Sequence, residues 1–244
     1  MQRQHVRHEQ NAAHVAAWDM PTRLFHWTLA ALILTAWLSY RFSESFGDNL
    51  LKWHRWNGLA ILVLLVWRVL WGIVGSSTAR FGSFLRGPAA VLGYARDLLA
   101  GRSRRFLGHN PAGSLMVLAL LSIAAVQGAL GLFTVEHNDL TAGPLYRLVD
   151  EATTKQISRW HRWLYYWVLL PAVALHVTAN VLYGVVKREP LIKAMLTGRK
   201  PAAAYEDQSE AAIVTRPLLR AAICLAVAGT IVLGGIYTSV GRLV

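Results

Sequence analysis

Two histidines, His161 and His176, lie fifteen positions apart in one apolar run, WHRWLYYWVLLPAVALHVTANVLY (residues 160–183). The run can cross a bilayer, since a spanning helix needs about 20 apolar residues. In an α-helix, fifteen residues rise roughly 22 Å and leave the two side chains within about 60° of one direction. Pro171, between them, predicts a kink. Ionisable groups inside a spanning helix are costly and indicate function. The spacing therefore predicts two cofactor sites, one near each membrane face.

Two more histidines complete the pattern. His26 lies four residues into the first apolar run, and His54 lies at the start of the second. Because successive spanning helices run in opposite directions, the depths predict that His54 pairs with His161 near the outer face. By the same argument His26 pairs with His176 near the inner face. One histidine in a membrane helix can simply be a hydrogen-bonding group between helices. Four at matched depths on three helices indicate either two metal sites of two histidines each or a proton relay.

The residue types limit the metal. A structural zinc site needs four ligands, and the first four apolar runs contain no aspartate or glutamate to supplement two histidines. The single cysteine, Cys224, excludes a Cys-ligated iron–sulfur cluster and a covalently attached haem. Haem iron needs only two axial ligands, because the porphyrin supplies the other four. Two facing histidines meet that need directly.

Neighbouring residues agree with haem without requiring it. Arginines beside the histidines could pair with haem propionates, although arginines that extend to the membrane surface would look the same. Another arginine lies deep in the second run, between VLLVW and VLW, where it must reach the inner surface or pair with an anionic group. Glycines could admit a flat ring or allow close helix packing. The arginines are Arg23, Arg55, Arg162 and the deep Arg68; the glycines are Gly58, Gly128 and Gly131.

The elements that must position these residues are five apolar runs, at about 22–42, 53–75, 113–135, 160–186 and 217–240. With 55% hydrophobic and 16% charged residues, the composition is that of a membrane protein. The net charge of +12 comes from basic loops between the runs, which indicates topology signals and lipid head-group contacts rather than nucleic-acid binding. We expect an all-α membrane protein: a four-helix transmembrane bundle with two b haems, plus a fifth C-terminal transmembrane helix.

Charge in the loops predicts the orientation. Fifteen basic residues lie in the N-terminal tail and in the loops after the second and fourth runs, so these segments are expected in the cytoplasm. Five crossings then place the C-terminus in the periplasm. We expect a polar cytoplasmic tail at 1–20, the di-haem domain at 21–198 and an amphipathic surface connector at about 84–100. A cytoplasmic linker at 199–216 and the fifth helix at 217–244 complete the chain.

Several motifs resemble the bacterial di-haem cytochrome b family, which includes the cytochrome b561 type and the cytochrome b subunits of nickel–iron hydrogenases. They are WDMPTRLFHW, RVLWGIVGSSTARF, GHNPAGSLMVLALL and LIKAMLTGRK, together with the spaced His161 and His176. The likeness covers about residues 18–200. It implies that His26, His54, His161 and His176 are axial ligands of two b haems. It also implies that a quinone exchanges electrons with these haems, and that a c-type cytochrome or an oxidoreductase subunit engages the outer side.

We therefore expect an electron-transfer subunit in the bacterial inner membrane, linked to quinone; whether it is itself an enzyme stays open. Gln127 and Asn180 are candidate quinone contacts, although hydrogen bonding between helices explains them equally well. His109 is expected on the surface of an inner loop. Glycines in the fifth helix suggest packing with a partner or a second copy of the chain. Two rival functions stay open: a haem-binding membrane anchor of a hydrogenase-like complex, and a proton-coupled transporter with a histidine relay.

Overall fold

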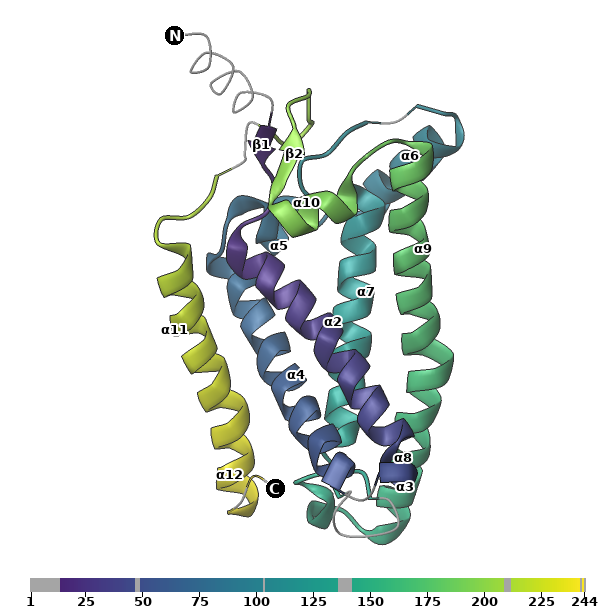
Figure 1. Ribbon diagram of the computed structural model, residues 1–244, viewed down its shortest axis with the longest axis vertical. Coiled ribbons are helices and arrows are strands. Elements are labelled where there is room, and N and C mark those ends of the chain that lie inside the picture. The colour runs from purple at the N-terminus through teal and green to yellow at the C-terminus, as the bar shows by residue number, and fades with distance from the viewer. Residues whose placement is uncertain are drawn as a thin grey trace. The chain divides into compact units, whose positions relative to one another are not determined.

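The computed structural model describes residues 14–46, 49–102, 104–135, 142–208, 212–241 and 243. Helices dominate these residues, and the chain divides into two compact units, which are described separately (Figure 1). Unit 1 comprises residues 1–24, 71–118 and 176–221, and unit 2 comprises 25–70, 119–175 and 222–244. The elements, in order, are β1 (His14–Ala16), α2 (Met20–Arg41), α3 (Ser43–Phe46), α4 (Asn49–Val74), η1 (Ser77–Ala79), α5 (Phe81–Phe84), α6 (Pro88–Leu99), α7 (Pro111–Gly131), η3 (Tyr146–Leu148), α8 (Glu151–Leu164), η4 (Tyr165–Leu169), α9 (Leu170–Val186), α10 (Leu191–Thr197), β2 (Arg199–Pro201), α11 (Pro217–Gly229), η6 (Thr230–Gly234) and α12 (Gly235–Val240).

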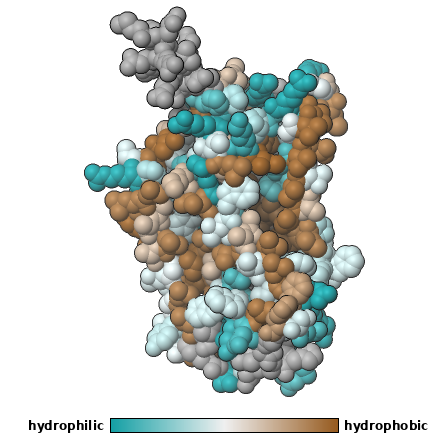
Figure 2. All heavy atoms as spheres, in the orientation of Figure 1, coloured by the Kyte–Doolittle hydropathy of each residue, from teal (hydrophilic) through white to brown (hydrophobic). Residues whose placement is uncertain are grey.

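Four helices among the described residues are long and apolar enough to cross a membrane. They are Asn49–Val74, Pro111–Gly131, Glu151–Val186 and Pro217–Val240. The first predicted crossing forms the 22-residue helix α2 but is not one of these four. Large apolar side chains on the helices are exposed, including Trp167 at 71% and Val185 and Val186 at 73% each. Figure 2 shows such apolar residues on one face of the molecule. Exposed apolar surface of this extent indicates contact with lipid rather than water.

Unit 1 contains a small polar layer in which three distant segments are joined. β1 pairs antiparallel with β2, with His14 opposite Pro201, and the two strands lie beside α10 (Figure 1). Residues 14–19, which the sequence placed in a tail, are thus part of this layer, and Ala17 and Trp18 are buried in its core with Leu107 and Ala194. These two short strands are a departure from an all-α fold.

The segment expected to be a linker, 199–216, supplies much of the layer. The Asp207 carboxylate accepts hydrogen bonds from the backbone N–H groups of Leu107 at 2.6 Å and Gly108 at 2.8 Å. Lys200 is 3% exposed, and its ammonium group donates to the carbonyl of Phe106 at 2.8 Å. Burial lowers the pKa of Lys200, while the nearby carboxylates of Glu189 and Asp207 act in the opposite direction. The loop before α7 is therefore held in place by side chains from beyond the end of α10.

Unit 2 contains parts of α2, α4, α7 and α8, packed through an apolar core of Ile61, Leu65 and Ala124. Asp150 caps α8: the Thr153 N–H donates to its carboxylate at 2.9 Å, which holds the pKa of Asp150 below its ordinary value. The loop before η3 packs tightly on the end of α7. There a Cβ at Gly143 would lie 2.2 Å from the Gly131 carbonyl oxygen, so only glycine fits.

A π-helical turn, η4, joins α8 to α9, and it lies directly before Pro171. Leu170 N–H donates to the carbonyl of Tyr165, five residues earlier. Proline has no N–H to offer to the preceding turn, which makes a widened turn at this point less costly. The sequence predicted a kink at this proline, and the irregularity takes the form of an added residue in the turn before it.

Asp207 offers a test of the polar layer. Asp207→Ala removes the acceptor for two backbone N–H groups, and hydrogen bonds to charged groups contribute about 1.5–3 kcal/mol each. We expect a clear fall in the thermal unfolding temperature of the detergent-solubilised protein. The neighbouring Glu206→Ala is the control, since Glu206 is exposed and bonds Arg105 only through its backbone N–H. Equal stability of the two variants would contradict the role given to Asp207.

Candidate functional site

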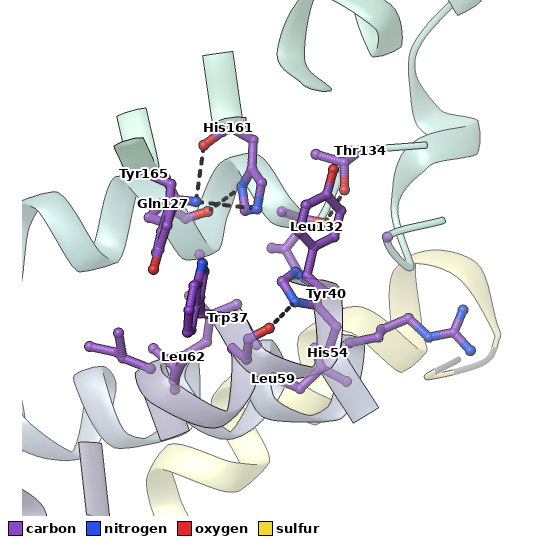
Figure 3. Close-up of a pocket in the computed structure, with 18 of the residues that line it drawn as sticks. Trp37, Tyr40, His54, Leu59, Leu62, Gln127, Leu132, Thr134, His161 and Tyr165 are labelled. Carbon is purple, nitrogen blue, oxygen red and sulfur yellow. Dashed lines mark hydrogen bonds between the residues drawn. The ribbon is translucent and has the colours of Figure 1, made fainter. Parts of the chain in front are cut away.

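A cavity opens between the helices of unit 2, and two of the four predicted histidines line it. About 1280 Å³ of space free of atoms lies in it, counting the part open to the outside. His54 comes from the second turn of α4, and His161 from the last turn of α8. Figure 3 shows their rings with Trp37, Tyr40 and Tyr165 around the same space. The lining is mainly apolar, and this matches a flat, largely apolar group.

A backbone carbonyl orients each imidazole. The Nδ1 of His54 lies 2.8 Å from the carbonyl oxygen of Ala36, and the Nδ1 of His161 lies 3.0 Å from that of Gln127. A carbonyl only accepts hydrogen bonds, so both Nδ1 atoms must carry the proton. Nε2 of each ring then has a lone pair for a metal. Fixing the tautomer through the other ring nitrogen is how proteins prepare histidine ligands.

The distance between the rings suits one shared metal ion. Their centroids are 6.3 Å apart, with the ring planes at 83°. An imidazole nitrogen binds a first-row metal ion at about 2.0–2.1 Å and lies about 1.1 Å from its own ring centre, so ligands on opposite sides of one ion have centroids about 6.2–6.4 Å apart. No group of three or more His, Cys, Asp or Glu residues that could hold a metal occurs among the described residues. A pair of protein ligands matches an iron whose other four positions are filled by a porphyrin.

Glycines shape two walls of the cavity. A Cβ at Gly131 would lie 3.2 Å from Cε1 of His161, so the absence of a side chain lets the imidazole rest against α7. A Cβ at Gly58 would meet nothing within 4 Å, and Gly58 faces the open cavity. Gly128 instead makes room for Leu62, whose Cδ2 would lie 2.7 Å from a Cβ. Of the three predicted glycines, Gly58 therefore fits the role of admitting a ring, while Gly128 and Gly131 serve packing.

Two predicted arginines, Arg55 and Arg162, line the cavity. One guanidinium nitrogen of Arg55 donates to the carbonyl of Ala142 at 3.1 Å, which ties α4 to the loop before η3. Arg162 is exposed at the cavity wall. A cation at the rim of an apolar cavity is well placed to pair with the carboxylates of an amphipathic cofactor.

The structure describes the other two histidines in different units, so their pairing stays a prediction. His26 is half-buried in unit 2 and meets the Trp27 ring edge-on, with centroids 5.0 Å apart. His176 is half-buried in unit 1, where the side-chain amide of Asn180 donates to its backbone carbonyl at 2.7 Å. Asn180 is therefore a neighbour of a predicted ligand within the same helix.

The remaining arginines and His109 have specific surroundings. Arg23 donates to the carbonyl oxygens of Met195 and Leu196 at the end of α10, so it stabilises that helix terminus. Arg68 is 3% exposed and does not reach solvent. His109, expected on the surface, lies between Trp18 and Phe84, with ring centroids at 4.7 and 4.8 Å. Its role within unit 1 is therefore packing.

The cavity residues that sequence reasoning missed include Ala36, Tyr40 and a loop that contains Gly143 and Pro144. Ala36 acts through its backbone, which leaves no signal in the residue type. Tyr40 lies 5.8 Å from His54 between ring centroids, one turn after Ala36 on α2. Gly143 and Pro144 come from a loop whose approach to α7 depends on backbone pairing with Leu132 and Thr134. All three depend on which helices are neighbours, and no residue type signals that.

Fold and site define a helical membrane protein that is suited to hold a metal cofactor between two histidines. The family model described as prokaryotic cytochrome b561 matches residues 17–198, and the chain belongs to this family. It is therefore a multi-pass bacterial membrane protein that carries b-type haem and takes part in electron transfer.

Relatives of known name agree with this assignment. The chain is similar to a probable Ni/Fe-hydrogenase B-type cytochrome subunit from Azotobacter vinelandii, with 24% identity over 218 residues that cover 78% of this chain and 89% of the relative. A protein of the same name from Rhizobium leguminosarum bv. viciae is 24% identical over 213 residues, covering 76% and 88%. No solved structure gives a significant match.

Gly58 gives a direct test of what fills the cavity. The Cβ of Gly58→Val would meet nothing within 4 Å, so we expect the protein to accumulate and fold, but the added methyl groups would occupy cofactor space. We expect loss of one haem, measured by pyridine haemochrome assay of the purified protein. Gly229→Val in α11 is the matched control, since a Cβ there also meets nothing within 4 Å. Full haem content in Gly58→Val would contradict the assignment of this cavity.

Proposed function

We propose that the protein transfers electrons between the membrane quinone pool and a redox partner on the outer side, through two b haems. The observation that carries this proposal is the geometry of His54 and His161. Their ring centroids lie 6.3 Å apart and each Nδ1 is bonded to a backbone carbonyl, which supports the proposal that the two Nε2 atoms bind one iron, with the Gln127 amide giving up its contact to the His161 Nε2. A haem bound there supplies one-electron chemistry to a chain whose own side chains cannot.

The chain's residues position and insulate the outer haem. His54 and His161 would hold its iron, and with both axial positions filled by protein, the site favours electron exchange over oxygen binding. Arg55 and Arg162 would pair with its propionates. The apolar lining excludes water from the ring and lowers the local dielectric, which adjusts the reduction potential.

The second haem would be held by His26 and His176. Support for this pair comes from the matched depths predicted from the sequence and from membership of the family. Arg68 is the proposed propionate partner on this side, because a guanidinium group buried to 3% exposure at membrane depth suits a buried anion.

Two side-chain amides, those of Asn180 and Gln127, are the proposed quinone contacts. Asn180 lies one turn after His176, and Gln127 lies at the outer cavity, but the amide nitrogen of each already donates to a backbone carbonyl. Either amide would therefore offer a quinone its remaining hydrogen-bonding capacity. Of the two, Asn180 is the better candidate, because its bond lies within its own helix and can be exchanged without separating two helices.

The pairing of β1 with β2 supports the proposed topology. Ala16 and Arg199 are paired, so they lie on the same side of any membrane, and the chain between them must cross an even number of times. Three of the long apolar helices lie between these residues, so α2 is required as the fourth crossing. All fifteen basic residues of the predicted cytoplasmic segments fall in unit 1. The N-terminus is then cytoplasmic, and a fifth crossing places the C-terminus in the periplasm of an inner-membrane protein.

The names of the relatives favour a second candidate function, a haem-binding anchor subunit of a hydrogenase-like complex. The two functions differ in whether quinol reduces the haems at a rate that serves the partner. Anaerobic stopped-flow mixing of the purified protein with a quinol analogue decides between them. Reduction of both haems on a millisecond-to-second timescale supports electron transfer, and haems that stay oxidised support the anchor.

Haem stoichiometry in ligand variants tests the pairing. We expect about two b haems per chain with low-spin spectra, since each iron has two nitrogen ligands. His54→Ala and His161→Ala should each remove the same haem, and His26→Ala and His176→Ala should remove the other. Haem quantitation with difference spectra identifies which haem remains. His109→Ala is the control and should keep both. A colourless folded protein would contradict haem binding. Loss of the same haem in both His54→Ala and His26→Ala would contradict the proposed pairing.

A further inference from the structure

Gln127 and His161 are joined by a reciprocal pair of hydrogen bonds. The His161 ring donates from Nδ1 to the backbone carbonyl of Gln127 at 3.0 Å. In return, the side-chain amide nitrogen of Gln127 donates to the backbone carbonyl of His161 at 3.1 Å and lies 3.2 Å from the ring Nε2. Each residue thus uses its side chain to bond the main chain of the other, across α7 and α8 (Figure 3).

The side-chain amide of Gln127 leaves one polar atom without a hydrogen bond, which an apolar side chain at this position would avoid. Oε1 of Gln127 is buried and has no hydrogen-bond partner among the described residues. A buried acceptor without a donor is unfavourable and calls for an explanation. Neighbours of Gln127 on α7, namely Ala124, Gly128 and Gly131, carry no polar side chain and line the same cavity. Contact of the amide nitrogen with His161 supplies that explanation.

We propose that Gln127 is a positioning residue for the outer haem, acting through its ligand His161. This inference rests on the function proposed above. The second hydrogen bond prevents the imidazole-bearing turn of α8 from rotating relative to α7. It also keeps the amide N–H groups close to Nε2, where one of them occupies the ring lone pair until iron binds there. Positive charge near the iron favours the reduced state, so the amide raises the reduction potential of that haem.

Asn180 shows why this role belongs to Gln127. It carries the same amide group beside a predicted ligand, yet its bond to the carbonyl of His176 spans four residues of a single helix. The same amide nitrogen lies 3.4 and 3.5 Å from the two ring nitrogens of His176, but all of these contacts stay within one helix and do not join two helices. Gln127 and His161 are 34 residues apart, and their paired bonds fix two helices against each other at the ligand.

Two substitutions separate shape from hydrogen bonding. Gln127→Met keeps the length of the side chain and removes the amide, while Gln127→Asn keeps the amide but shortens it by one methylene, so that it falls short of the His161 carbonyl. Potentiometric titration and low-temperature electron paramagnetic resonance of the ferric haems are the readouts. In both Gln127 variants we expect a lower midpoint potential for the haem that is lost in His161→Ala. The reduction equilibrium of this haem should change several-fold, and a tenfold change corresponds to 59 mV. Its low-spin signal should also shift, while the second haem stays unchanged.

Controls define the outcomes. Asn180→Leu and Thr134→Val should leave the outer haem unchanged; Thr134 also lies at the cavity wall, but its hydroxyl donates to the carbonyl of Gly131 at the end of α7 and not to a histidine. Selective loss of the outer haem in either Gln127 variant would also support the proposal. Unchanged potential and spectrum in both variants, or equal changes in both haems, would overturn it. Wild-type protein without haem would instead refute the proposed function itself, so the two failures are distinguishable.

Discussion

The site formed by His54 and His161 depends on two hydrogen bonds from imidazole to main-chain carbonyl. Inside an apolar bundle an unheld histidine would rotate, protonate or bond a neighbouring carbonyl at random, and each event would remove a metal ligand. The carbonyls of Ala36 and Gln127 fix the proton on Nδ1 of His54 and His161 and leave each Nε2 with a lone pair that can bind iron. Those carbonyls belong to α2 and α7, and the imidazoles to α4 and α8, so four helices of unit 2 determine the geometry of one two-histidine site.

The polar layer of unit 1 has a different kind of order. Its contacts are backbone pairing, a buried lysine and a bridging carboxylate, and none of them lies among the long apolar helices. A lysine at 3% exposure is tolerated because its ammonium group donates to the Phe106 carbonyl and lies near two carboxylates. The segments that the sequence presents as tail, loop and linker therefore form one structural element of unit 1. This element joins residues 14–19, the loop before α7 and the segment after α10.

The sequence predicted the type of cofactor better than the contacts between distant segments of the chain. Hydropathy and histidine spacing sufficed to predict membrane helices and a b-type haem, because the apolar runs and the scarcity of carboxylates leave few alternatives. Matched depths predicted that His54 and His161 share a metal; their ring centroids lie 6.3 Å apart, and the shared iron stays a proposal. Backbone acceptors such as Ala36, the strand at His14–Ala16 and the contact of Gln127 with His161 could not be predicted. Each depends on which segments are neighbours, and nothing in the residue type encodes that. His109, expected on the surface, is packed between two aromatic rings for the same reason.

Pairing between β1 and β2 also constrains the order of assembly. His14 emerges from the ribosome 187 residues before Pro201, the residue opposite it in the ladder. At roughly 5–20 residues per second, the first strand waits roughly 10 to 40 seconds for its complement. During that interval three long apolar helices are synthesised and can enter the bilayer. Closure of this ladder is therefore a late event, which seals the amino-terminal segment only after the helices that carry the proposed haem ligands have been made.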